Sequence, residues 1–171
     1  GLNAEDASIK RIRVMGPYFQ ANGIYPLFYT WRTGLLETLA GALDNALGPA
    51  PGQAIAGGLI AEARDKLLEA VAHNLKWLWN EMKANAAQAA LDDGALALLA
   101  AALGRLRAAH PALELHLVGH SAGAFVHGHL LDLCQGAGLP VASVTLYAPA
   151  CPLAFAASHY QARVADGFLA A

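Results

Sequence analysis

The sequence predicts an α/β fold with a doubly wound, mostly parallel sheet. Runs rich in aliphatic and β-branched residues, typical of buried strands, alternate with stretches whose apolar residues recur at helical spacing. Strands that are separated by helices pair in parallel through right-handed crossovers. The 171 residues fit one domain, residues 1–171, and the helical stretch 53–110 is longer than one crossover needs. We therefore expect an incomplete sheet of this type with a helical, cap-like insertion at 53–110.

The first fifty residues predict a helix, a strand and a second helix. Residues 4–21 have apolar side chains at helical spacing and end at an Asn-Gly pair that stops helices. Residues 24–31 form a compact aromatic and aliphatic run that predicts a buried strand, although Pro26 cannot donate a hydrogen bond there. A second helix is expected over 34–47, before a break rich in proline and glycine.

The insertion has a helical pattern almost throughout. An Asp-Asp-Gly sequence at 92–94 begins its last helix, which ends near Ala109. His73 and Trp77 share a helix face, and Trp79 follows closely in sequence. These three side chains fit either a lipid-facing lid or an aromatic contact in the core. As a cap, the insertion would exclude water from the site described below and shape its substrate pocket.

The second half of the chain has shorter elements with short connections. In order, they are a strand at 113–118, a helix at 122–134, a turn at 136–138, a strand at 141–147, a loop at 148–152 and a weaker helix from 153 onward. This order of strand, helix and strand predicts that the two strands pair in parallel.

Composition limits the classes to which the protein can belong. Hydrophobic residues make up 56% of the chain and charged residues 14%, and the mean hydropathy is +0.37. No apolar run approaches the roughly 18 residues of a spanning helix, so the sequence predicts no transmembrane segment. The excess apolar surface has to be covered by a large core, by self-association or by segments outside this chain. A net charge of -2 gives no basic field for nucleic acid or anionic lipid.

The two cysteines, Cys134 and Cys151, do not make a disulfide framework, and no residue spacing matches a zinc site. The sequence therefore predicts no metal and no cofactor, and a reducing cytoplasm is the default location. No signal peptide is recognisable at the start, but the chain begins without Met, which leaves open that the true N-terminus is missing.

The most specific pattern is Gly119-His120-Ser121-Ala122-Gly123, a G-x-S-x-G pentapeptide between a predicted strand and a predicted helix. In that context it is typical of a nucleophile elbow, a sharp turn that raises its serine above the sheet. The glycines let strand and helix pass closely, and the turn aims the helix N-terminus at whatever the serine attacks. The pattern predicts Ser121 as a catalytic nucleophile, with His120 as a filler of the elbow.

The chain resembles the α/β-hydrolase superfamily, in particular its bacterial esterase- and lipase-like members. The matching segments are 115–123 (LHLVGHSAG) and 146–150 (LYAPA) on the next strand. In that family an oxyanion loop with the sequence His-Gly-Gly follows an earlier strand, and Gly1-Leu2-Asn3, directly before a predicted helix, resembles the tail of such a loop. The resemblance implies oxyanion donors at the N–H of Ala122 and of Gly1 or Leu2, each worth on the order of 3–4 kcal/mol in the transition state. It is specific only around the elbow, since upstream strands and a complete His-Gly-Gly sequence are absent.

A serine hydroxyl needs an imidazole to accept its proton and a carboxylate to orient that imidazole, in the chain order serine, acid, histidine for this fold. Five candidates follow the serine: Asp132, Asp166, His127, His129 and His159. Asp132 lies roughly 16 Å along the helix, and His127 and His129 on the same helix are expected to be surface or packing residues. His159 and Asp166 come in the reverse order. The acid and the base are therefore expected beyond residue 171, which would make the chain a fragment of a catalytic domain.

Two pairs of residues are further candidates for a substrate pocket. Trp31 and Arg32 follow the predicted strand at the edge where doubly wound sheets place their ligands. Arg32 could bind an acidic group of a substrate or be a solvated loop residue. Tyr147 and Cys151 leave the next strand at the same edge, where they could line an acyl pocket or pack in the ordinary way.

Two classes of function fit these patterns. The first is a serine hydrolase that cleaves small-molecule carboxylic esters, lipid-like ones included, through an acyl-enzyme at Ser121. A close variant is a transacylase, in which an alcohol or amine replaces water. The second is a catalytically inactive module of the hydrolase fold that serves in binding or assembly. The intact elbow favours the first class, and the missing acid and histidine favour the second.

Overall fold

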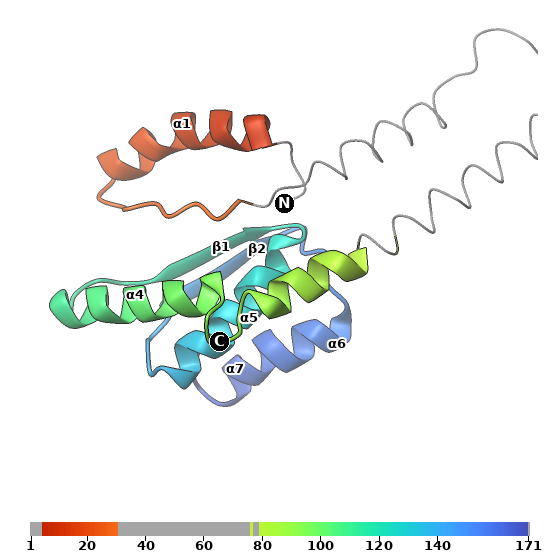
Figure 1. Cartoon of the computed structure of the whole chain (residues 1–171). Helices are drawn as coiled ribbons and strands as arrows, with labels where there is room; N and C mark the ends of the chain where they lie inside the picture. Colours follow the sequence, from red (N-terminus) through yellow and green to blue (C-terminus); the bar gives the residue numbers. More distant parts are fainter. Residues whose placement is uncertain (1–4, 31–75, 77–78, 171) are drawn as a thin grey trace, which may run out of the picture. The chain divides into compact units, whose positions relative to one another are not determined.

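The computed structural model describes residues 5–30, 76 and 79–170 (Figure 1). The chain divides after Asn80 into two compact units, which are described one at a time. Over the described residues the fold is mixed α/β, with helices and a parallel sheet of two strands. Several expectations fall outside this part of the chain: the helix at 34–47, the segment 53–75 of the insertion, and the candidates Gly1, Leu2, Trp31, Arg32, His73 and Trp77.

In the first unit, helix α1 spans Glu5–Ala21, in agreement with the prediction. Gly23 follows with a φ of 74°, a left-handed conformation that lets the chain reverse after the helix. Residues 24–30 then run back beside α1, where the ring centroids of Phe19 and Phe28 lie 6.5 Å apart (Figure 1).

The prediction of a buried strand at 24–31 is wrong for residues 24–30. These residues form no strand, and the side chain of Tyr25 is 77% exposed. An apolar run becomes a strand only when a neighbouring strand pairs with its backbone, and Pro26 has no N–H for such a ladder. Among the described residues, only β1 and β2 are paired as strands.

The second unit begins within a helical stretch at 79–88 and continues into helix α4, Ala95–Ala109. Helix α4 begins directly after the Asp-Asp-Gly sequence at 92–94 and ends at His110, in agreement with the prediction. Its buried side chains are spaced along one face: Leu96, Ala100 and Leu103. This spacing places that apolar face against the rest of the unit.

The sheet consists of β1, His116–His120, and β2, Ser143–Tyr147. The strands pair in parallel with His116 opposite Ser143 and His120 opposite Tyr147, as the order of elements predicted. Strand β1 begins later than expected and continues into the pentapeptide. Both strands therefore end at the same edge of the sheet, where Ser121 follows β1 directly.

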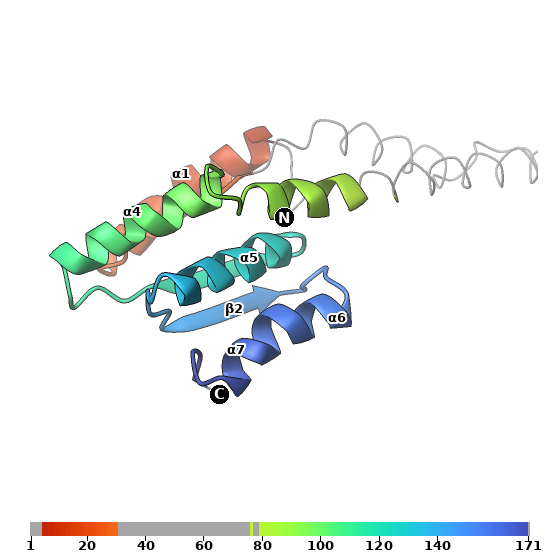
Figure 2. The same ribbon diagram turned by 60° about the horizontal axis from the view of Figure 1, so that its bottom comes forward.

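Helix α5, Gly123–Gly136, connects the two strands and lies along them (Figures 1 and 2). The alternation of β1 places Leu117 against the helices, whereas Val118 on the opposite face is 61% exposed. The core joins α4, α5, the sheet and the C-terminal segment, and its buried members are Ala100, Leu103, Leu117, Leu130, Leu131, Cys134, Leu139, Val141 and Leu169. The core thus holds α5, and with it the turn that precedes α5, firmly on the sheet.

The chain ends in a continuous helical run of three segments: α6 (Leu153–Ala156), the π-helix η1 (Ala157–Gln161) and α7 (Ala162–Ala165). The run packs on α5, where the rings of Phe125 and Phe155 meet edge to face with centroids 4.8 Å apart. A Cβ atom at Gly128 would lie only 2.6 Å from Cε1 of Phe155, so this close approach requires a glycine.

None of the helices in the described part of the chain has the length and apolar character needed to span a membrane.

Candidate active site

The sharp turn predicted at the pentapeptide is present. Ser121 follows the last residue of β1 and precedes the first turn of α5, and its φ is 53°. This left-handed conformation is unfavourable for a residue with a Cβ atom. Among the described residues outside glycine, only Ala148 shares it, with a φ of 42°. Strained backbone of this kind persists only where the surroundings hold it in place.

Three backbone hydrogen bonds hold Ser121 in this conformation. Its N–H donates to the carbonyl oxygen of Tyr147 at 3.0 Å, and its own carbonyl oxygen accepts from the N–H groups of Ala124 at 3.1 Å and Ala150 at 3.0 Å. The turn is thus fixed both to the start of α5 and to the loop after β2. All three bonds use backbone atoms of Ser121, and none of them uses its hydroxyl group.

The two glycines of the pentapeptide have different environments. A Cβ atom at Gly119 would lie 2.7 Å from Cδ2 of His127 and 3.0 Å from Cδ2 of Leu146, whereas one at Gly123 would have no neighbour within 4 Å. The expected reason for both glycines, a close approach of strand and helix, therefore applies to Gly119 and not to Gly123.

Helix α5 presents its N-terminus at the turn. The backbone hydrogen bonds of this segment use the N–H groups of Ser121, Ala124 and Phe125, and none of those found in residues 79–170 uses the N–H of Ala122. Ala122 is fully buried, so this N–H does not contact bulk water. Such a donor, at the positive end of a helix dipole, is suited to bind an anion.

The structure brings three further candidates to the edge of the sheet that holds Ser121. His120 is exposed and pairs in register with Tyr147, whose side chain is 59% exposed. Cys151 is half-buried in the loop that hydrogen-bonds to Ser121 through Ala150. Burial raises the pKa of the Cys151 thiol, so no thiolate is favoured there.

His127 lies close to the elbow but is engaged elsewhere. Its Nε2 donates to the carbonyl oxygen of Val118 at 2.9 Å, and its Nδ1 is buried without a hydrogen-bond partner. Burial lowers the pKa of His127 below its usual 6.5, although the bond to Val118 acts in the opposite direction. The ring is therefore a neutral packing residue above Gly119, as the sequence predicted.

The other two histidines meet away from the elbow. His159 Nδ1 lies 2.5 Å from Oδ2 of Asp132, and the ring of His129 contacts His159 with centroids 5.0 Å apart. Burial, together with the neighbouring His159, lowers the pKa of His129, and Asp132 acts in the opposite direction. Asp166 accepts a hydrogen bond from Gln135 at 2.7 Å. The interactions of these residues are with one another and with neighbouring helices.

The pairing of Asp132 with His159 was not predicted from the sequence. The one available signal was the spacing of His129 and Asp132, which places both on one face of α5. No sequence pattern indicated that η1 would bring His159 to that face.

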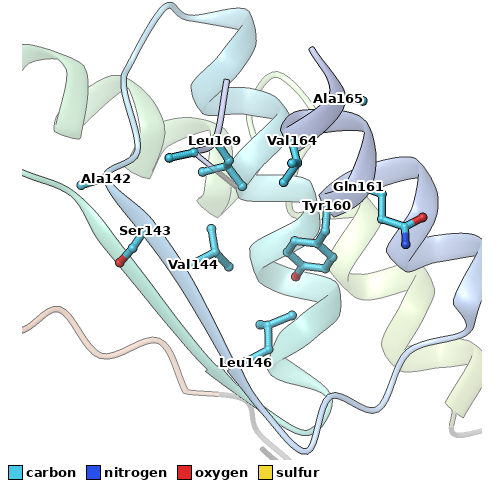
Figure 3. A pocket seen from close by; sticks show the side chains of 10 residues that line it. Ala142, Ser143, Val144, Leu146, Tyr160, Gln161, Val164, Ala165 and Leu169 are labelled. Carbon is cyan, nitrogen blue, oxygen red and sulfur yellow. The ribbon is translucent and has the colours of Figure 1, made fainter. Parts of the chain in front are cut away.

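A hollow of 590 Å³ lies between β2 and the C-terminal helical run (Figure 3). Its lining is mostly apolar, with the side chains of Val144, Leu146 and Leu169 facing Tyr160 and Val164. The Tyr160 hydroxyl donates to the carbonyl oxygen of Ala124 at 2.5 Å. Ser121 does not line this hollow, so the position of the hollow does not link it to the reaction proposed for Ser121.

Comparison with known proteins found no matching family model, no matching curated protein and no matching solved structure.

Proposed function

We propose that the chain is the nucleophile-bearing part of a serine hydrolase that cleaves carboxylic esters through an acyl-enzyme at Ser121. The observation on which this proposal depends is the left-handed Ser121 at a strand-turn-helix junction, fixed by hydrogen bonds to Tyr147 and Ala150. A turn that only connected a strand to a helix would have no need for this strain.

The reaction would proceed in two displacements. Ser121 Oγ attacks the ester carbonyl while a base takes its proton, and the carbonyl oxygen becomes an oxyanion that the N–H of Ala122 can bind. Collapse of this intermediate expels the alcohol, which receives the proton, and leaves an acyl group on Oγ. Water then attacks the acyl-enzyme in the same manner and releases the acid and the free serine.

The base and its carboxylate would come from outside the described residues. His127, His129 and His159 are each engaged with other groups, at Val118, Phe155 and Asp132. The second oxyanion donor would likewise come from outside the described residues.

We also propose that β1 and β2 belong to a larger, doubly wound sheet of the α/β-hydrolase type. Val118 and Tyr147 are 61% and 59% exposed, whereas Leu117, on the opposite face of β1, is buried in the core. A parallel sheet is ordinarily covered on both faces, so this exposed face would be covered in the complete domain. Helix α4, the last part of the expected insertion, packs in the core with α5.

The alternative is a module of the same fold that binds or assembles without catalysis. It is favoured by one observation: among the described residues, no histidine forms a hydrogen bond with Ser121. The two functions differ in whether the serine reacts.

Hydrolysis of p-nitrophenyl esters of increasing acyl length by the full-length protein tests the proposal. Ser121→Ala should lower kcat/KM by roughly 10³-fold or more, because the nucleophile is lost. Ser158→Ala is the matched control, since its exposed hydroxyl bonds only to the carbonyl oxygen of Phe155, and it should leave the rate unchanged. A folded full-length protein that hydrolyses none of the esters would favour the binding module. Preference for long acyl chains would support lipid-like substrates.

A further inference from the structure

Three side chains that can bind a metal ion meet where η1 packs on α5. His129 and Asp132 lie one helical turn apart on α5, and His159 reaches them from η1. One ligand atom from each residue lies within 4.8 Å of the other two, and all three residues are half-buried. The rings of His129 and His159 are inclined at 72°, so they are not stacked on each other.

Two features of the helices bring these residues together. The absence of a side chain at Gly128 allows η1 to approach α5, since a Cβ atom there would lie 3.2 Å from Cβ of His159. His159 lies within the five-residue π-helix, a widened turn that is rare in proteins and frequent at functional sites.

Asp132 has an unsatisfied acceptor in this cluster. Its Oδ2 is bound to His159, but its Oδ1 is buried without a hydrogen-bond partner. The nearest cation, Arg163 Nη1, lies 3.8 Å from Oδ1, which is too far for a hydrogen bond. A buried carboxylate oxygen is costly unless a donor or a cation satisfies it.

The local charge also favours a cation. Arg163 lies between the carboxylates of Asp132 and Asp166, with its Nε 3.3 Å from Asp166 Oδ2. The two carboxylates thus outnumber the one guanidinium that lies between them. A divalent ion would reverse that balance by compensating Asp132 directly.

We infer that His129, Asp132 and His159 form a binding site for a divalent transition-metal ion of the Zn²⁺ type, independent of the reaction at Ser121. Two imidazole nitrogens and one carboxylate oxygen are ligands that Zn²⁺ accepts, and the fourth position of a tetrahedron remains for water. The bound ion joins α5 to η1 and so fixes the C-terminal helical run.

Binding requires a small local change. Ligand atoms roughly 2.0–2.2 Å from Zn²⁺ lie farther from one another than the 2.5 Å between His159 Nδ1 and Asp132 Oδ2. The two groups therefore separate by somewhat under ~1 Å. For Nδ1 of a neutral His159 to bind the metal, its proton is lost to solvent and Nε2 takes up another, so the ring changes tautomer and stays neutral.

Without a metal, the same contact is an interhelical hydrogen bond between Asp132 and His159. In that case His129 would be a neighbouring ring that takes no part in the hydrogen bond between Asp132 and His159. Removal of the His129 imidazole therefore separates the two interpretations, because it abolishes a ligand and leaves the hydrogen bond intact.

The test is a calorimetric titration of the chelator-treated full chain with Zn²⁺. We expect one ion per chain with micromolar or tighter affinity. His129→Gln and Asp132→Asn should each weaken binding by at least ~10-fold. His116→Gln is the control: this exposed histidine bonds to Ser143 and lies near Glu114, outside the cluster, so affinity should not change.

Two additional readouts keep the result independent of folding defects in a variant. Co²⁺ bound to the unaltered chain should give the intense visible absorption of a low-coordinate site, and Zn²⁺ should displace it. Circular dichroism should show that His129→Gln is folded. Absence of Zn²⁺ binding by the unaltered chain, or equal Zn²⁺ affinity in folded His129→Gln, would overturn the inference.

Discussion

The N–H of Ser121 donates to the carbonyl oxygen of Tyr147 at 3.0 Å, so the turn after β1 is tied to the last residue of β2. The bond joins two strands through a residue with left-handed backbone. It explains why the conformation of Ser121 is a property of the folded sheet and does not arise from the pentapeptide alone. The conformational cost at Ser121 leads to the first prediction.

Ser121→Gly should be more stable than Ser121→Ala by about 1 kcal/mol. Glycine adopts a φ of 53° without a steric penalty, whereas alanine retains the Cβ atom that causes it. Urea denaturation of the two variants measures the difference in the free energy of unfolding. The same pair at Ser158, which lies in η1, should have the opposite order, because glycine destabilises a helix. Equal stabilities of the two Ser121 variants would contradict the strained turn.

Gly128→Ala should destabilise the protein by roughly 1–3 kcal/mol, because the added methyl group would lie 2.6 Å from Phe155. Gly104→Ala in α4 is the matched comparison: its Cβ atom would have no neighbour within 4 Å, so it should stabilise the helix by about 0.5–1 kcal/mol. Thermal denaturation should thus move the two Tm values in opposite directions. A Gly128→Ala variant as stable as the unaltered protein would mean that α6 does not pack on α5 at this position.

Acidification should destabilise the protein through His127. Burial lowers the pKa of His127 in the folded state below 6.5, so the unfolded chain binds its proton first as the pH falls. The contribution of neutral His127 to the free energy of unfolding is therefore fully present above pH 6.5. It is lost as the pH falls toward the lower pKa of the folded state. His127→Gln keeps an N–H donor for Val118 without titrating, so its free energy of unfolding should fall less between neutral and mildly acidic pH. EDTA in the buffer removes any contribution from metal ions. An equal decrease in both proteins would contradict the burial of this imidazole.

The two thiols should differ in their reaction with a thiol reagent near neutral pH. Cys134 is fully buried, and burial raises its pKa to about 11, so it should react only after unfolding. Cys151 is half-buried with a raised pKa, so it should react slowly in the folded protein. In a colorimetric titration, one thiol per chain, that of Cys151, should therefore react slowly in the native protein. Both thiols should react in denaturant. Rapid reaction of both thiols in the native state would mean that the core around Cys134 is open.

The features that the sequence predicted well are those with local causes. The sharp turn at Ser121 follows from small residues between an apolar strand and an apolar helix, and the start of α4 follows from the turn residues at 92–94. In both cases the residues that signal the feature are neighbours in the chain, although the hydrogen bond to Tyr147 is needed to hold Ser121 in place. The parallel pairing of β1 with β2 follows in turn from the helix between them.

The features that the sequence did not reveal depend on distant partners. The apolar run at 24–30 has the composition of a strand, but a strand exists only where another strand pairs with it. Likewise, the contact of His159 with Asp132 depends on the packing of η1 against α5 at Gly128. The π-helix itself has no recognisable sequence pattern, so the position of His159 could not be derived from spacing.

Reaction of the full-length protein with a fluorophosphonate, followed by peptide mass spectrometry, tests the central claim most directly. An activated serine forms a covalent phosphonyl adduct, whereas an ordinary serine hydroxyl does not react. The account predicts one adduct per chain, located on Ser121 and absent from Ser121→Ala. A folded protein that remains unlabelled, or an adduct located on Ser143 or Ser158, would contradict the assignment of Ser121 as the nucleophile.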